Sequence, residues 1–277
     1  MNLKTIIRNI IAVFLGIAIT ALALFFALKI SFFNETVFDY AVNNCDYISE
    51  LGKEINENAA EVIELYDLSH VLDVEESLAS FDFPSEVVRY FHLRMQGIDT
   101  EIDNKAFRSY NHKMVDPVIA SRGLSPEASA ALINEIDKQL LLAYNIPFLY
   151  SPLTLFLNSS SQYQKLLDYL IYLTAGLCGV FLFFSIILKA KKFVTTLYLV
   201  LTVSCLSSII TYLVINKFNF KNESASFAVF INGILNTTAL LMQFVCLFLF
   251  YALLVLLVSN FAKFIFVKWQ KKRQEGS

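Results

Sequence analysis

Apolar residues are concentrated in a few long runs of this chain, separated by distinctly polar stretches. Residues 10–28 carry no charged side chain over 19 positions, and residues 225–262 carry none over 38. Two further apolar stretches cover residues 169–188 and 193–215. A helix of about 20 apolar residues crosses the hydrocarbon core of a bilayer. The pattern therefore predicts four transmembrane helices.

A polar insert, residues 34–165, separates the first of these runs from the second. Apolar residues between Val37 and Tyr66 recur mostly at three- and four-residue steps, which is typical of an amphipathic helix. We expect one long helix there, with Asn34 as its N-cap. The insert has no convincing alternation of apolar and polar residues of the kind that strands show. The predicted fold class is an all-α membrane protein with a helical domain between its first and second spans.

Start and stop signals divide the rest of the insert into shorter helices. Residues 99–112 are polar, and we expect a loop with one helical turn. Residues 148–157 are too short to span a membrane, so they belong either to the core of the insert or to a membrane surface. The expected helices are one capped by Ser69 and running to Leu78, one capped by Ser85 and stopped by Gly97, and one that begins at Ser125, Pro126 and Glu127 and ends near Tyr144, before Pro147.

The uncharged run at residues 225–262 is too long for one span and short for two spans joined by a turn. We expect a single long helix, with residues 239–258 in the membrane and its start projecting towards the insert. A re-entrant hairpin near Asn232 and Gly233 is the alternative.

Basic residues gather beside the ends of the predicted spans, and they predict the orientation of the chain. With four spans, every basic cluster falls on one side, which the positive-inside rule makes cytoplasmic. The insert is then extracytoplasmic at the cell membrane. Apolar residues continue past Lys29, which favours an uncleaved anchor over a signal peptide cut near residues 21–23. The clusters are Lys4 and Arg8, then Lys189, Lys191 and Lys192, then Lys263, Lys268, Lys271, Lys272 and Arg273.

The predicted organisation has four parts. Residues 1–33 form the cytoplasmic N-terminus and the first transmembrane helix, and residues 34–165 form the extracytoplasmic helical domain. Residues 166–262 form the second to fourth transmembrane helices, and residues 263–277 form a basic cytoplasmic tail.

The net charge of −2 conceals two regions of opposite sign. Residues 31–165 hold 21 acidic and 9 basic residues, while the rest of the chain holds 3 and 13. An acidic domain argues against nucleic-acid binding, which needs a basic face, and favours a basic protein partner. The basic tail suits anionic lipid headgroups. Cys45 is the insert's only cysteine, so the insert holds no internal disulfide, which favours a bacterial source.

Mild polar residues lie within the predicted spans, which hold no charged residue in their central parts. Ser204, Ser208 and Thr211 share one helical face, and so do Asn232, Asn236 and Gln243. These faces either pack against other helices through hydrogen bonds or line a cavity for a small ligand. The first run also carries a ridge of small residues for close packing, namely Ala12, Gly16, Thr20, Ala23 and Ala27.

Residue types that hold metals or catalyse reactions are sparse. His70 has Asp67 and Asp73 three residues away on either side, and such a trio could bind a divalent metal if the segment were helical. A solvated surface cluster is the simpler interpretation. The sequence has no G-x-S-x-G motif and no phosphate-binding glycine loop. We therefore expect no enzyme and no cofactor.

The leading functional hypothesis is a non-enzymatic membrane protein whose extracytoplasmic domain binds a protein partner or ligand. It could serve as a sensor, an accessory subunit or a toxin-immunity protein. One alternative is a small channel or transporter subunit that uses the polar faces of the third and fourth spans, and the chain could then form a homo-oligomer. The second alternative is a cell-envelope enzyme with a site at the membrane surface.

Overall fold

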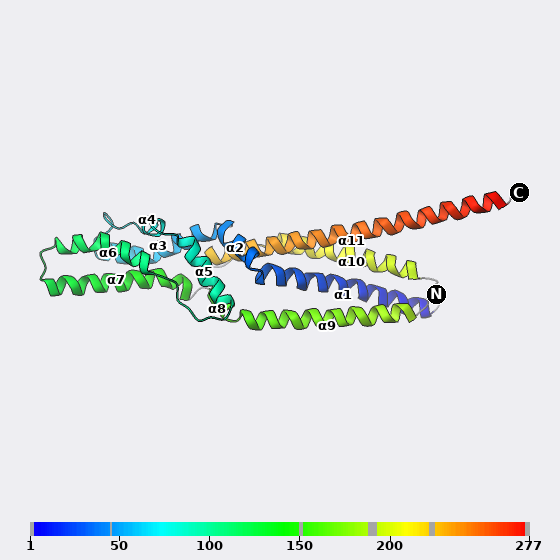
Figure 1. Ribbon diagram of the computed structural model, residues 1–277, viewed down its shortest axis with the longest axis horizontal. Helices are drawn as coiled ribbons and strands as arrows, with labels where there is room; N and C mark the ends of the chain where they lie inside the picture. Colours follow the sequence, from blue (N-terminus) through cyan, green and yellow to red (C-terminus); the bar gives the residue numbers. More distant parts are fainter. Residues whose placement is uncertain (1–2, 45, 150–151, 188–192, 222–224, 275–277) are drawn as a thin grey trace. The chain divides into compact units, whose positions relative to one another are not determined.

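The computed structural model describes residues 3–44, 46–149, 152–187, 193–221 and 225–274. All regular elements of these residues are α-helices, with no strand (Figure 1). This confirms the all-α class. In chain order the helices are α1 (Leu3–Phe33), α2 (Glu35–Asn44), α3 (Tyr47–Leu65), α4 (Val74–Ala79), α5 (Phe83–Met95), α6 (Lys105–Ala120), α7 (Pro126–Leu149), α8 (Pro152–Asn158), α9 (Ser160–Ile187), α10 (Phe193–Lys217) and α11 (Ala225–Gln274).

Four of these helices, α1, α9, α10 and α11, are long and apolar enough to cross a membrane. Helix α11 is continuous through Asn232 and Gly233. The single long helix expected there is confirmed, and the re-entrant hairpin is wrong. The run contains no proline, so nothing in the backbone interrupts the hydrogen bonds of the helix.

The chain forms two compact units. The apolar unit comprises residues Met1–Phe32, Lys165–Phe218 and Leu235–Ser277, and the insert unit comprises Phe33–Gln164 and Asn219–Ile234. The insert unit therefore includes the first turns of α11, which the sequence-based boundaries assigned to the spans. Helix α11 contributes residues to both units.

The apolar unit has a core built around small residues of α1. Ala12, Leu15 and Ala18 are buried there against Cys178 of α9 and Val200 of α10. A Cβ atom on Gly16 would lie 2.8 Å from the Val203 Cβ, closer than real side chains approach. Only glycine therefore allows α1 and α10 to come this near, in the manner of small-residue contacts between membrane helices.

The insert unit has an aromatic core that α11 completes. Phe230 of α11 packs against Phe38 of α2 with ring centroids 5.0 Å apart, and against Tyr47 of α3 at 5.9 Å. At the start of α11, Ser226 donates from both its N–H and its hydroxyl to the Glu54 carboxylate, at 3.0 and 2.9 Å. A carboxylate at a helix N-terminus is favourable because it faces the positive end of the helix dipole.

The long helix expected between Val37 and Tyr66 is wrong in one respect. Asn34 does cap its start, because the Asn34 Oδ1 accepts from the Val37 N–H at 3.3 Å. The chain then breaks at Asp46, whose φ of 57° is left-handed, and this break separates α2 from α3. Asp tolerates that conformation better than most residues. The preceding residue, Cys45, lies outside the described residues.

The expected caps of the next two helices are also wrong. Asp73, not Ser69, caps α4, since its Oδ1 accepts from the Glu75 N–H at 2.8 Å. Asp82, not Ser85, caps α5 and accepts from the Ser85 N–H at 3.3 Å. Aspartate is as good an N-cap as serine, so the choice of serine had no support from cap preference. The predicted stop is confirmed, because Gly97 follows α5 with a φ of 78°.

Residues 99–112 were expected to form a loop with one helical turn, but the residues from Lys105 onward belong to α6. Its buried residues lie at four-residue steps, but one of them, Asn111, is polar and obscures the pattern. Helix α7 begins as predicted, with the Ser125 hydroxyl accepting from the Ala128 N–H at 3.2 Å. It continues through Pro147 to Leu149 instead of ending near Tyr144.

For residues 148–157 the sequence allowed two interpretations, the core of the insert or a membrane surface. Phe148, Leu153 and Leu157 are buried within the insert unit. Leu149 and Leu155 remain exposed. One side of this segment is therefore core.

Candidate binding site

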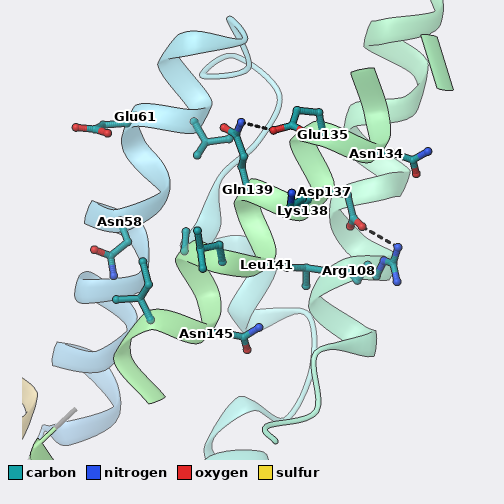
Figure 2. A pocket seen from close by; sticks show the side chains of 14 residues that line it. Asn58, Glu61, Arg108, Asn134, Glu135, Asp137, Lys138, Gln139, Leu141 and Asn145 are labelled. Atoms are coloured by element: carbon teal, nitrogen blue, oxygen red, sulfur yellow. Dashed lines mark hydrogen bonds and ion pairs between the residues drawn. The ribbon is translucent and has the colours of Figure 1, made fainter. Parts of the chain in front are cut away.

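A pocket of the insert unit lies along α3 and α7, with one residue from α6 (Figure 2). Its volume is about 900 Å³, which is within the range of ligand pockets. Nine of the fourteen lining residues carry amide or charged side chains, and five are aliphatic. The lining residues are Asn58, Glu61, Val62, Arg108, Asn134, Glu135, Asp137, Lys138, Gln139, Leu141, Leu142, Ala143, Asn145 and Ile146.

Asp137 anchors one wall of this pocket. Its side chain is only 9% exposed, and its Oδ2 lies 2.7 Å from Arg108 Nη2 (Figure 2). Its Oδ1 lies 3.3 Å from His112 Nε2. A buried carboxylate requires such partners because desolvation of an unpaired charge is costly. Arg108 and His112 are one turn apart on α6, so the carboxylate of α7 binds two adjacent turns of the neighbouring helix.

The imidazole of His112 extends this network to a second carboxylate. His112 Nδ1 lies 3.1 Å from Asp116 Oδ1, so both ring nitrogens face carboxylate oxygens. Only the imidazolium form donates from both nitrogens. The chain Arg108, Asp137, His112 and Asp116 thus alternates in charge when His112 is protonated, and it ties α6 to α7.

Gln139, two residues after Asp137 on α7, joins this wall of the pocket to the end of α3. Its Nε2 donates to Glu135 Oε1 at 2.8 Å (Figure 2) and to the Tyr66 hydroxyl at 3.3 Å. Tyr66 follows α3, so the Gln139 amide links α7 to the end of α3. Leu142 is 55% exposed on the same helix. The site therefore combines fixed polar groups with an exposed apolar side chain.

A buried tyrosine supports the helix that carries the pocket. Tyr144 of α7 donates its hydroxyl to the Asp103 carbonyl at 3.2 Å and stacks on Phe107 of α6 at 4.5 Å. Burial raises the pKa of Tyr144 far above its ordinary value, and the Glu86 and Asp103 carboxylates raise it further. The hydroxyl therefore remains a donor at physiological pH.

The remaining histidine contacts are separate from this pocket. His92 Nε2 of α5 lies 2.6 Å from Asp39 Oδ1 of α2. The predicted metal trio is not assembled, because the segment between α3 and α4 that holds Asp67 and His70 is not helical and Asp73 caps α4. Across the part of the chain that the structure describes, no group of three or more His, Cys, Asp or Glu side chains is arranged to hold a metal ion.

The polar face predicted on the third span packs against α1. The Ser204 hydroxyl donates to the Gly16 carbonyl at 3.0 Å, and the Thr20 hydroxyl donates to the Ser204 carbonyl at 3.1 Å. The hydroxyls of Thr20 and Ser208 are 3.5 Å apart. Thr211 instead donates to the Ser207 carbonyl of its own helix at 2.9 Å. The hydroxyls of Ser204 and Ser208 therefore contact the small-residue ridge of α1.

The polar residues predicted on α11 do not form one group. The Asn232 amide binds the segment before the helix, accepting from the Phe220 N–H at 2.8 Å and donating to the Asn219 Oδ1 at 2.9 Å. Asn236 and Gln243 are exposed. The sequence thus found these residues but not their separate environments.

The basic residues are described only in part. Lys263 and Lys268 are exposed on α11, while the side chains of Lys271, Lys272 and Arg273 lie outside the description. The predicted loop cluster of Lys189, Lys191 and Lys192 also lies outside the described residues. At the other end of α1, Lys29 forms an ion pair with Asp168 of α9.

Sequence reasoning did not find the pocket or the Asp137 network. One signal was available, because Asp137 directly follows Ile136 and precedes Leu140, which puts an acid on the buried face of a predicted helix. Its partners on α6 were hidden because that helix was not expected. No protein-family model, curated protein or solved structure matches this chain. The function must therefore be inferred from the site itself.

Proposed function

We propose that this protein is a multi-pass cell-membrane protein whose insert unit is an extracytoplasmic recognition domain for a basic segment of a partner protein. Helices α1, α9, α10 and α11 would cross the bilayer. The basic residues in the first turns of α1 and at the end of α11 favour cytoplasmic termini. The exposed Lys263 and Lys268 would then lie near anionic headgroups.

The observation that carries this proposal is the chemistry of the pocket along α3 and α7. Three lining carboxamides, Asn58, Asn134 and Asn145, can each donate and accept, as a peptide backbone requires. Exposed Leu142 offers a contact for an apolar side chain of the ligand. A peptide segment, with its alternating donors, acceptors and apolar groups, matches this lining better than a purely apolar ligand does.

The acidic charge of the insert favours a partner whose binding surface is positively charged. Residues 31–165 hold 21 acidic and 9 basic residues. Such a surface attracts a basic partner and accelerates its association, most strongly at low salt. Within the pocket, Glu61 and Glu135 supply carboxylates for lysine or arginine side chains.

A binding role suits the site better than catalysis. The most buried carboxylate, Asp137, is engaged by Arg108 and His112 and joins two helices. A channel role also gains no support, since the hydroxyls of Ser204 and Thr20 are bonded within the contact between α1 and α10.

Site-specific photocrosslinking tests the proposal in intact cells. A photoreactive phenylalanine derivative replaces Leu142 in the pocket or, as the matched control, Leu65, which is also exposed in the insert unit but lies outside the pocket lining. We expect a discrete adduct from position 142 alone. A synthetic peptide covering the captured segment should then bind the purified full chain more tightly at low salt than at high salt. Equal adducts from both positions, or a captured segment without basic residues, would refute the proposal.

A further inference from the structure

Helix α11, which does not line the pocket, carries a stripe of exposed residues with seven-residue spacing. The stripe contains two interleaved series within the apolar unit, offset by four residues. The first series is Asn236, Gln243, Phe250 and Leu257, and the second is Leu240, Leu247, Leu254 and Phe261. All eight side chains are exposed.

This stripe differs from the face through which α11 packs in its own chain. The buried residues Thr238, Met242 and Leu249 mark that inner face. At about 100° per residue, the stripe occupies an arc of about 100° centred roughly 120° away from the inner face. The alternation of three- and four-residue steps is the heptad spacing that lets two helices pack along a left-handed supercoil.

The amide of Gln243, which lies within the predicted membrane segment 239–258, points to what covers the stripe, and Asn236 lies one heptad before it, just outside that segment. Lipid tails solvate exposed leucine and phenylalanine as well as another helix would, but they offer nothing to an amide. A side-chain amide both donates and accepts, so an identical amide is a complete partner for it. Their seven-residue separation places both on the same seam.

The partner that best fits this stripe is a second copy of the same chain, related by a twofold axis. Every copy of this chain inserts in the same direction, so the α11 helices of two copies run parallel. A twofold axis along the membrane normal then brings each residue of the seam against its own equivalent, Gln243 against Gln243 and Leu247 against Leu247. A heptad seam with self-complementary amides satisfies this condition without any other protein.

We propose that α11 is a homodimerisation helix and that two copies pair through this stripe, with Asn236 and Gln243 forming amide-to-amide hydrogen bonds across the axis. Asn232 is excluded from the seam, because its amide is engaged by Asn219 and Phe220 of its own chain. The inference rests on the membrane placement under the proposed function, but not on the pocket.

Disulfide mapping in native membranes tests the pairing. In a full chain whose four native cysteines are replaced by alanine, single cysteines are introduced by Leu240→Cys, Leu247→Cys and Leu254→Cys. The matched controls Phe244→Cys, Phe248→Cys and Val255→Cys lie on the same helix and are also exposed, but they are roughly 90–130° from the centre of the seam. On mild oxidation we expect a product of twice the 31.5 kDa chain mass from the seam positions. The controls should give little.

A second measurement tests the amides. Gln243→Leu should weaken dimerisation about three- to tenfold, as expected for one or two interhelical hydrogen bonds, in dilution-dependent energy transfer between labelled full chains in lipid vesicles. Gln243→Asn should retain most of the affinity. Because the side chain is exposed in the single chain, the helix content should stay unchanged.

Several outcomes would overturn the inference. They are equal crosslinking from the control face, adducts of another mass in place of the dimer, and a monomer at every seam position. Dimerisation that is indifferent to Gln243→Leu would also overturn it. Failure of the photocrosslink at Leu142 would remove the recognition proposal and leave the seam result standing, so the two can fail independently.

Discussion

Replacing Gly16 with alanine should specifically destabilise the apolar unit. The new Cβ would lie 2.8 Å from the Val203 Cβ and 3.0 Å from the Val200 carbonyl oxygen. The second neighbour is backbone, so α10 has to move as a whole. Overpacking of this kind costs about 1–3 kcal/mol.

The same movement would weaken the hydrogen bonds that join the two helices. The Ser204 hydroxyl to Gly16 carbonyl bond and the Thr20 hydroxyl to Ser204 carbonyl bond both span this contact. Interhelical hydrogen bonds in membranes average about 0.6 kcal/mol. The total loss expected for Gly16→Ala is therefore about 2–4 kcal/mol.

The assay is denaturation of the purified full chain in mixed micelles, followed by circular dichroism. The matched control is Gly179→Ala in α9, where an added Cβ meets nothing within 4 Å. There alanine should be neutral or slightly stabilising because of its better helix propensity. Equal effects at both glycines, or a Gly16→Ala chain as stable as the original, would refute the packing argument.

Three further substitutions test the insert unit. Asp137→Asn should destabilise it by about 1–3 kcal/mol, less than for a fully buried pair because one partner, Arg108, is half exposed; hydrogen exchange of α6 and α7 should measure this. Phe230→Ala should cost about 3–5 kcal/mol and increase proteolysis of the insert unit, since this fully buried ring of α11 belongs to that core. Asp73→Ala should cost about 1 kcal/mol as a lost N-cap, measured by thermal unfolding.

Each of these has a neighbouring control that should have little effect. Asp116→Asn removes a half-exposed carboxylate, Tyr40→Ala removes an exposed ring of the insert unit, and Ser69→Ala removes a residue that caps no helix in the structure. Changes at such surface positions are usually within about 0.5 kcal/mol. If a control matched its partner variant, the contact assigned to that partner would be wrong.

The apolar helices were predictable because a helix that crosses a bilayer needs a long run of apolar residues, and such a run is visible in the sequence. A run without charge identifies a span, and start signals such as Asn34 and Ser125 identify the beginnings of helices. The continuity of α11 followed from a long run without proline. These features depend on neighbouring residues alone.

The remaining features depend on tertiary contacts. The break at Asp46 has no glycine or proline to announce it, and it occurs where Phe38 and Tyr47 both pack on Phe230. Asn111 is buried by neighbouring helices and hydrogen-bonded to the Ser77 hydroxyl at 3.2 Å, so its polarity misleads a pattern-based prediction. The partners of Asp137 likewise come from another helix.

The polar face of the third span illustrates the same limit. Its existence could be predicted, but its partner could not. Both α1 and α11 carried suitable residues, and the close approach at Gly16 decides for α1.

The most direct test of the central claim is the accessibility of the insert from outside the cell. In the chain with its native cysteines replaced, Leu142→Cys and Lys268→Cys place single exposed thiols in the insert unit and near the end of α11. We predict that a membrane-impermeant maleimide labels position 142 in intact cells and position 268 only after permeabilisation. Labelling of position 268 alone in intact cells, or of both positions only after permeabilisation, would contradict an extracytoplasmic recognition domain.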